Sequence, residues 1–200
     1  MAKSENTVSN NHEGNITSSD RIEFDTATNT ASFLIQSHKP SDKRIGLYIY
    51  TAISTGLRIS DLMRLTHEDM IKGFYEFREK KTSKSKRFPF PSSLISVYNR
   101  FADKGTGLLF AGSNGKAFSN SYINKRLKFL FENNETHVSS HSLRKTFGYR
   151  MYEKTENKSE ALYKLSEIFN HSNTGVTKIY IGLRAEELSN SIEEVIKFDI

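Results

Sequence analysis

Residues 141–147 read HSLRKTF, and they constrain the fold of this chain more tightly than any other stretch. His141 and Arg144 are three residues apart, and on an α-helix this spacing places both side chains on one face, one turn apart. We predict a helix over residues 140–153 that carries this pair. The stretch therefore predicts an imidazole and a guanidinium group directed toward one place.

Outward from this stretch, apolar residues at helical spacing predict that most of the chain is helical. In the clearest case, apolar residues from Ile45 to Ala52 recur at i, i+3, i+4 and i+7 after Ser41, which we expect to cap the helix. Residues 21–35 are compatible with either a strand or a helix. Further helices are predicted over residues 60–65, from Pro91 to Phe101, from the capping residue Ser119 to Phe131, and over 159–169, 174–181 and 185–197.

One β-hairpin interrupts this pattern. Two short aromatic runs, GFYEF at 73–77 and RFPF at 87–90, flank a basic loop, and Pro89 places the second run at a strand end or sheet edge. The predicted fold class is therefore mainly α (α+β), with one small antiparallel hairpin. A length of 200 residues is enough for one domain with a real core.

The composition indicates a protein with an anionic partner. The net charge is +6, and the segment 78–87, REKKTSKSKR, carries six basic residues against one acidic residue. Such a basic cluster is typical of nucleic-acid binding. The absence of cysteine excludes disulfides, a thiol nucleophile and a thiolate zinc site. No apolar run reaches the roughly 18 residues of a membrane span, so we expect no membrane partner and a cytoplasmic location.

Five signals together indicate phosphodiester chemistry. They are Arg58 in TGLRISDL at 55–62, the basic hairpin with Lys81, the His141 and Arg144 pair, His171 in a turn, and Tyr180 nine residues later. Guanidinium and imidazole groups can stabilise the extra negative charge of the transition state. A lysine can protonate the leaving oxygen, and a tyrosine can form a covalent phosphoryl ester. Because free tyrosine has a pKa of about 10, nearby cations are expected to lower it.

From about Ile45 to Tyr180, these motifs resemble the catalytic domain of the tyrosine recombinase (phage integrase) family. The resemblance implies a DNA-cleaving and rejoining enzyme with neither metal nor nucleotide cofactor. It implies phosphate binding by Arg58, Arg144 and His171, proton transfer assisted by His141, general acid catalysis by Lys81, a 3′-phosphotyrosyl bond at Tyr180 and a supporting carboxylate at Asp61. Further DNA contacts are expected from Lys80, Lys84, Lys86, Arg87 and Lys145.

Two departures from the family pattern matter. The family usually has Leu-Gly before the second histidine, where this chain has Phe169-Asn170. Asparagine tolerates the left-handed backbone that glycine supplies, so we expect the turn to survive. The other lysines of the hairpin compete with Lys81 for the role of general acid.

The resemblance also implies an organisation and partners. We expect a flexible or partly ordered arm over 1–40, a catalytic domain over 41–184 and an amphipathic helix over 185–200, which packs on its own domain or docks on a neighbouring protomer. Only some forty residues precede the expected catalytic domain, and in this short length the chain resembles the fimbrial phase-variation invertases. We expect the chain to bind double-stranded DNA and to form a homo-tetramer on synapsed DNA. Accessory DNA-bending or directionality proteins are further expected partners. Type IB topoisomerase-like activity and a non-catalytic DNA-binding accessory role are the alternatives.

Overall fold

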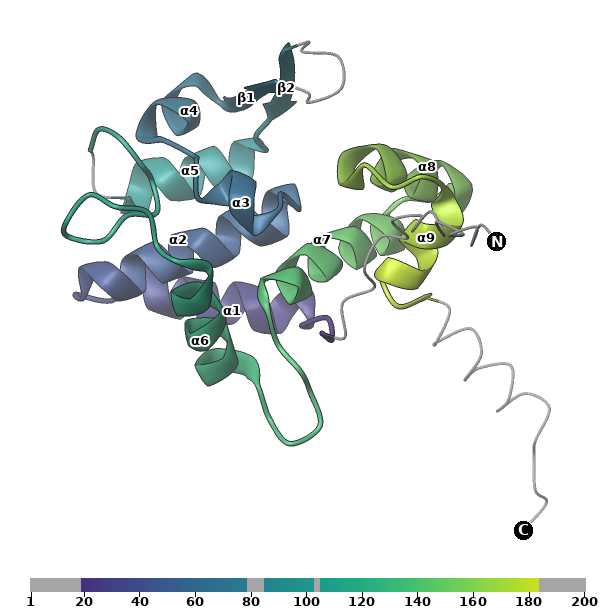
Figure 1. Cartoon of the computed structure of the whole chain (residues 1–200), viewed down its shortest axis with the longest axis horizontal. Helices are drawn as coiled ribbons and strands as arrows, with labels where there is room; N and C mark the ends of the chain where they lie inside the picture. Colours follow the sequence, from purple (N-terminus) through teal and green to yellow (C-terminus); the bar gives the residue numbers. More distant parts are fainter. Residues whose placement is uncertain (1–18, 79–84, 103–104, 184–200) are drawn as a thin grey trace, which may run out of the picture.

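The computed structural model describes residues 19–78, 85–102 and 105–183, and within these ranges the fold is mainly helical with one small sheet (Figure 1). The mainly α fold class with an antiparallel hairpin is confirmed. The terminal helix predicted over 185–197 lies outside the described residues. None of the described helices combines the length and apolar character needed to cross a membrane. The elements are α1 (Phe24–Ile35), α2 (Pro40–Thr55), α3 (Ile59–Leu62), α4 (His67–Lys72), β1 (Phe74–Arg78), β2 (Ser85–Pro89), α5 (Ser92–Phe101), α6 (Asn120–Phe131), α7 (Ser140–Lys154), α8 (Lys158–Phe169) and α9 (Thr174–Tyr180).

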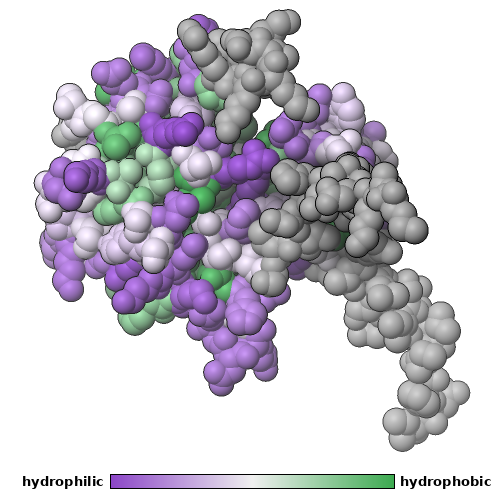
Figure 2. All heavy atoms as spheres, in the orientation of Figure 1, coloured by the Kyte–Doolittle hydropathy of each residue, from purple (hydrophilic) through white to green (hydrophobic). Residues whose placement is uncertain are grey.

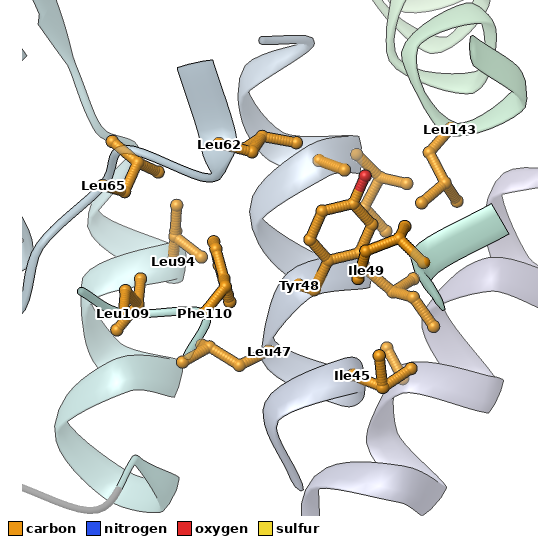
Figure 3. Packing of buried hydrophobic residues seen from close by; sticks show 14 of the residues in the cluster. Ile45, Leu47, Tyr48, Ile49, Leu62, Leu65, Leu94, Leu109, Phe110 and Leu143 are labelled. Atoms are coloured by element: carbon orange, nitrogen blue, oxygen red, sulfur yellow. The ribbon is translucent and has the colours of Figure 1, made fainter. Parts of the chain in front are cut away.

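Helix α2 is the centre of the main hydrophobic core. Its residues Ile45, Tyr48 and Ile49 are fully buried, and Figure 3 shows Tyr48 among aliphatic side chains from several elements. The helix begins two residues earlier than a Ser41 cap predicts, with Lys39 at the N-cap, because a proline at the first helical position needs no N–H partner. It ends at Gly56, whose φ of 61° is left-handed.

The stretch over 21–35, for which the sequence left strand and helix open, contains helix α1. Its face of Ala27, Ala31, Leu34 and Ile35 is buried against α2, so this helix belongs to the core. Gly46 in α2 permits the close approach of the two backbones. A Cβ at this position would lie 2.7 Å from Ile35 N and 2.8 Å from Ala31 O.

Gly46→Ala should therefore destabilise the protein by about 1–3 kcal/mol, the usual cost of overpacking a tight core. The clash is with backbone atoms, which cannot move as a flexible side chain can. Gly112→Ala is the control, because its nearest neighbour is the Asn114 side chain at 3.3 Å. Urea unfolding followed by circular dichroism measures both. A Gly46→Ala variant as stable as the control would contradict this account of the helix pair.

The predicted hairpin is present, with β1 antiparallel to β2 and Tyr75 paired with Phe88. Arg87 on β2 is exposed, lies 3.6 Å from the Glu76 carboxylate and stacks over the Phe74 ring. The residues between the strands, 79–84, lie outside the described part of the chain, and with them the predicted roles of Lys80, Lys81 and Lys84. Lys86 belongs to β2. The described surface seen in Figure 2 is mostly hydrophilic, with apolar side chains in small separate patches.

Helices α7, α8 and α9 enclose a second, smaller apolar cluster. Its buried members are Leu165, Phe169, Tyr180, Ile181 and Leu183. A glycine in α7 allows the close packing, because a Cβ at this residue, Gly148, would lie 2.6 Å from Ile181 Cγ2. Helix α7 also contacts α2, so it joins the two clusters (Figure 1). The candidate active site lies where these helices meet.

Candidate active site

Predicted site residues from separate elements converge at the C-terminal end of α8. Arg58 is the N-cap of α3, and Arg144 lies in the second turn of α7. Their guanidinium groups both donate to the backbone carbonyl of Phe169, at 2.8 Å from Arg58 Nη2 and 3.1 Å from Arg144 Nη2. The last carbonyls of a helix have no partner within the helix, so this oxygen is free to accept from side chains. It therefore holds two cations side by side.

Arg144 is the more deeply placed of the two. Only 5% of it is exposed, and its guanidinium lies 4.1 Å from the centre of the Phe169 ring. Its Nη1 donates to the carbonyl of Gly56, the residue that ends α2. Burial lowers the pKa of Arg144 to about 10, so the group remains a cation at neutral pH. An anion beside this pair of guanidinium groups would be strongly favoured.

The turn after α8 survives the replacement of the family's glycine. Asn170 has φ 53° and ψ 48°, the left-handed conformation expected of it, and it is the one non-glycine residue with positive φ in the described ranges. The N–H of His171 then donates to Ser166 O at 2.9 Å. This geometry turns the chain from α8 toward α9 and brings His171 to the site.

Tyr180 lies at the end of α9 with its ring in the smaller apolar cluster. The tyrosine is 7% exposed, and its ring packs at 5.3 Å from the Phe169 ring and 5.1 Å from the His171 ring. Burial raises its pKa, and the smaller effects of Arg144 and Arg58 lower it. The expectation that nearby cations bring this pKa below its ordinary value is therefore wrong for the DNA-free chain. Burial outweighs the two guanidinium groups.

The Tyr180 hydroxyl has an imidazole beside it. The Tyr180 oxygen lies 3.2 Å from Nδ1 of His141. The pKa of His141 is lowered by burial and then by Arg144, Lys145 and Arg58. A neutral imidazole nitrogen at this distance can accept the phenolic proton.

His171 is also held neutral, because burial and then Arg144 and Arg58 lower its pKa to about 4. Its Nδ1 lies 3.0 Å from the hydroxyl oxygen of Thr177, which is fully buried. The sequence did not single out Thr177, because a threonine in a short helix has no distinguishing context. Its place one turn before Tyr180 is the only signal available.

His171 gives a testable pH dependence of stability. Its folded pKa of about 4 lies below the ordinary 6.5, so between these values the unfolded chain binds more protons than the folded chain. The free energy of unfolding should therefore fall as the pH decreases through this window. His171→Gln should reduce that slope relative to the slope of the wild type. Urea unfolding across the window measures both slopes, and an unchanged slope in His171→Gln would refute the assignment.

Two other predicted residues occupy different settings. Asp61 is half-buried, three residues after Arg58, and its charge raises the pKa of Arg144, which is the direction expected of a supporting carboxylate. Lys145 is only 8% exposed, and its Nζ donates to the Ser19 carbonyl at 2.5 Å. The DNA contact predicted for Lys145 stays a prediction, and in the DNA-free chain its amine lies on this carbonyl.

This chain is similar in sequence to known integrases and recombinases. The sequence profile of the Phage integrase family matches residues 23–187. The probable integrase/recombinase YoeC of Bacillus subtilis (strain 168) is 30% identical over 142 residues, which are 68% of this chain and 76% of YoeC. Tyrosine recombinase XerC of Actinobacillus pleuropneumoniae serotype 7 (strain AP76) is 29% identical over 162 residues. That match covers 76% of this chain but only 52% of XerC, so the chain spans about half the length of such relatives.

Solved structures share the fold. The XerA recombinase superposes with a TM-score of 0.62 at 18% identity, over 89% of this chain and 65% of XerA. The catalytic domain of bacteriophage HP1 integrase superposes with a TM-score of 0.54 at 19% identity, over 87% of this chain and 94% of that domain. The profile match extends from the start of α1 past Tyr180 and so includes every element that builds the site. This chain belongs to the phage integrase family of tyrosine recombinases.

Proposed function

We propose that this protein is a site-specific DNA recombinase that cleaves and rejoins DNA through a 3′-phosphotyrosyl bond to Tyr180. The observation that carries the proposal is the Tyr180 hydroxyl, 3.2 Å from His141 Nδ1 and next to the two arginines held on one carbonyl. Nucleophile, base and charge-stabilising groups within one site are what phosphoryl transfer needs.

In the proposed reaction the scissile phosphate binds at Arg58 and Arg144, which donate to its non-bridging oxygens. The Tyr180 oxygen attacks the phosphorus as its proton passes to His141. The bond from phosphorus to the 5′ oxygen breaks, and that oxygen takes a proton from a hairpin lysine, for which Lys81 is the first candidate. The phosphotyrosyl ester keeps the bond energy, so a 5′ hydroxyl of the partner strand can attack it and restore Tyr180.

The high pKa of Tyr180 fits this order of events. Loss of the phenolic proton to bulk water would leave a buried anion, which is unfavourable. Transfer to His141 during attack avoids that anion, because charge moves directly onto the phosphate oxygens beside the arginines. The role of His141 in the proposal is therefore that of a general base.

Solved relatives support a double-stranded DNA partner. The XerH recombinase was captured in a post-cleavage complex with its palindromic difH substrate, and it superposes on 90% of this chain with a TM-score of 0.61 at 18% identity. We propose that this chain likewise acts on duplex DNA, as a homo-tetramer on the synapsed sites and with accessory proteins. Of the arm expected over 1–40, residues 24–35 form helix α1, which packs in the core and so belongs with the catalytic domain expected over 41–184. For residues 185–200 the proposal is an amphipathic helix that packs on its own domain or docks on a neighbouring protomer.

Covalent trapping tests the proposal. The protein is incubated with end-labelled duplexes from DNA flanking its own gene, nicked so that the short released fragment, which carries the new 5′ hydroxyl, diffuses away. The expected result is an SDS-resistant adduct whose tryptic peptide carries nucleotide on Tyr180. Transfer of the bound strand to a second duplex would separate a recombinase from a topoisomerase, which reseals its own strand. Binding without any adduct would favour the accessory role and contradict the proposal.

A further inference from the structure

His171 and Thr177 form a contact whose donor and acceptor depend on which ring nitrogen of His171 carries the proton. Thr177 is fully buried, and its hydroxyl oxygen has two neighbours, His171 Nδ1 at 3.0 Å and the Asn173 carbonyl oxygen at 3.4 Å. A hydroxyl has one proton to donate, so it cannot donate to both. The state of the imidazole depends on which acceptor receives that proton.

Geometry favours the imidazole as the acceptor. The contact with the Asn173 carbonyl is at the long limit of a hydrogen bond, and so is the contact of the Thr177 backbone N–H with the same oxygen, at 3.5 Å. The contact with His171 is 0.4 Å shorter. A neutral imidazole has one protonated nitrogen and one acceptor nitrogen. The low pKa of His171 keeps its ring in this neutral form near pH 7.

We infer that Thr177 is a positioning residue: its hydroxyl donates to Nδ1 of His171 and so fixes the ring proton on Nε2. The Nε2–H group is then a donor for a non-bridging oxygen of the scissile phosphate, a step that rests on the proposed function. With the proton on Nδ1 instead, Nε2 would direct a lone pair at an anion. A neighbour that fixes the tautomer of a functional histidine is a recurrent device in enzymes.

Helix α9 thereby supplies two groups on one structural unit. Tyr180 is three residues after Thr177, one turn further along the same helix. The Asn173 side chain caps this helix by accepting from the Val176 N–H at 3.0 Å, which fixes its first turn. Any displacement of α9 would therefore move the nucleophile and the partner of His171 together.

Nitrogen-15 NMR of the protein labelled at histidine tests the inference without DNA. In the wild type, His171 should be present as the Nε2–H tautomer, with Nδ1 shifted as an acceptor of a hydrogen bond. Thr177→Val keeps the shape of the side chain and removes the hydroxyl, and it should give a mixture of tautomers. Thr177→Ser keeps the hydroxyl and should restore the wild-type signal. A wild-type Nδ1–H tautomer, or no change in Thr177→Val, would overturn the inference.

Adduct formation on nicked DNA gives the second readout. We expect Thr177→Val to be about tenfold slower than the wild type, the effect of losing one orienting hydrogen bond, and Thr177→Ser to be within about threefold. Equal loss in both variants with an unchanged tautomer would mean a purely structural role and would overturn the inference. Thr177→Ala provides the comparison if the valine variant does not fold. Should the wild type form no adduct, the proposed function fails, while the NMR result still decides whether Thr177 fixes the tautomer.

Discussion

Tyr180→Phe should abolish the covalent adduct, with a loss of at least about a thousandfold in cleavage, the scale seen when a catalytic nucleophile is removed. The phenolic oxygen is the atom that bonds to phosphorus in the proposed reaction, and no other described hydroxyl occupies its place beside His141. The ring remains in contact with Phe169 and His171, so the packing of α9 is kept. Adduct yield on nicked DNA, resolved on denaturing gels, measures the loss.

A matched control comes from α8. Tyr163 is exposed and its hydroxyl donates to the Glu167 carboxylate at 3.3 Å, so Tyr163→Phe should cleave like the wild type. Tyr180→Phe should lose about 1 kcal/mol of stability or less, the usual worth of one hydrogen bond. An adduct that persists in Tyr180→Phe would refute the assignment of the nucleophile, and with it the proposed reaction.

Arg144→Lys should reduce the rate of adduct formation by about 10²–10³, the range found when one donor to a developing oxyanion is lost. Lysine keeps the positive charge but lacks the planar fork that reaches the Gly56 and Phe169 carbonyls together. Binding of DNA should change much less than cleavage, because contacts from other basic residues remain. Single-turnover cleavage with saturating enzyme separates the two effects.

Stability must be measured alongside the Arg144→Lys rate. The guanidinium is buried, and a buried carbonyl left without a partner costs about 1–3 kcal/mol. The control is Arg150→Lys on the same helix, where Arg150 pairs with Glu153 at 2.9 Å on the surface. A folded Arg144→Lys variant that cleaves within about threefold of the wild type would show that this guanidinium does not stabilise the transition state.

Periodicity and turn chemistry were enough to predict most of the helices. The repeat of Ile45, Tyr48, Ile49 and Ala52 marks the buried face of α2, and Ser119 caps α6 by accepting from the Tyr122 N–H. Asn170 takes the left-handed conformation expected where the family has glycine. These features depend on residues that are neighbours in the sequence, so they can be predicted from the sequence alone.

What the sequence could not provide depends on contacts between distant residues. The structure of α1 was undecided because its buried face is defined by Gly46 and the α2 surface rather than by its own pattern. The raised pKa of Tyr180 reflects burial that only the packed helices create. The partner of Lys145 could not be predicted either, because its amine donates to the carbonyl of Ser19, a residue more than a hundred positions earlier in the chain.

The carbonyl of Phe169 has a consequence for how the proposed recombinase would engage DNA. An unrestrained arginine side chain loses about 2 kcal/mol of rotamer entropy when it is immobilised. Since Arg58 and Arg144 are already fixed on this oxygen, that entropy is lost during folding and not when DNA arrives. An incoming phosphate has only to exchange one acceptor for another, with little rearrangement of the cations. The end of α8 thus preorganises an anion site before any anion is bound.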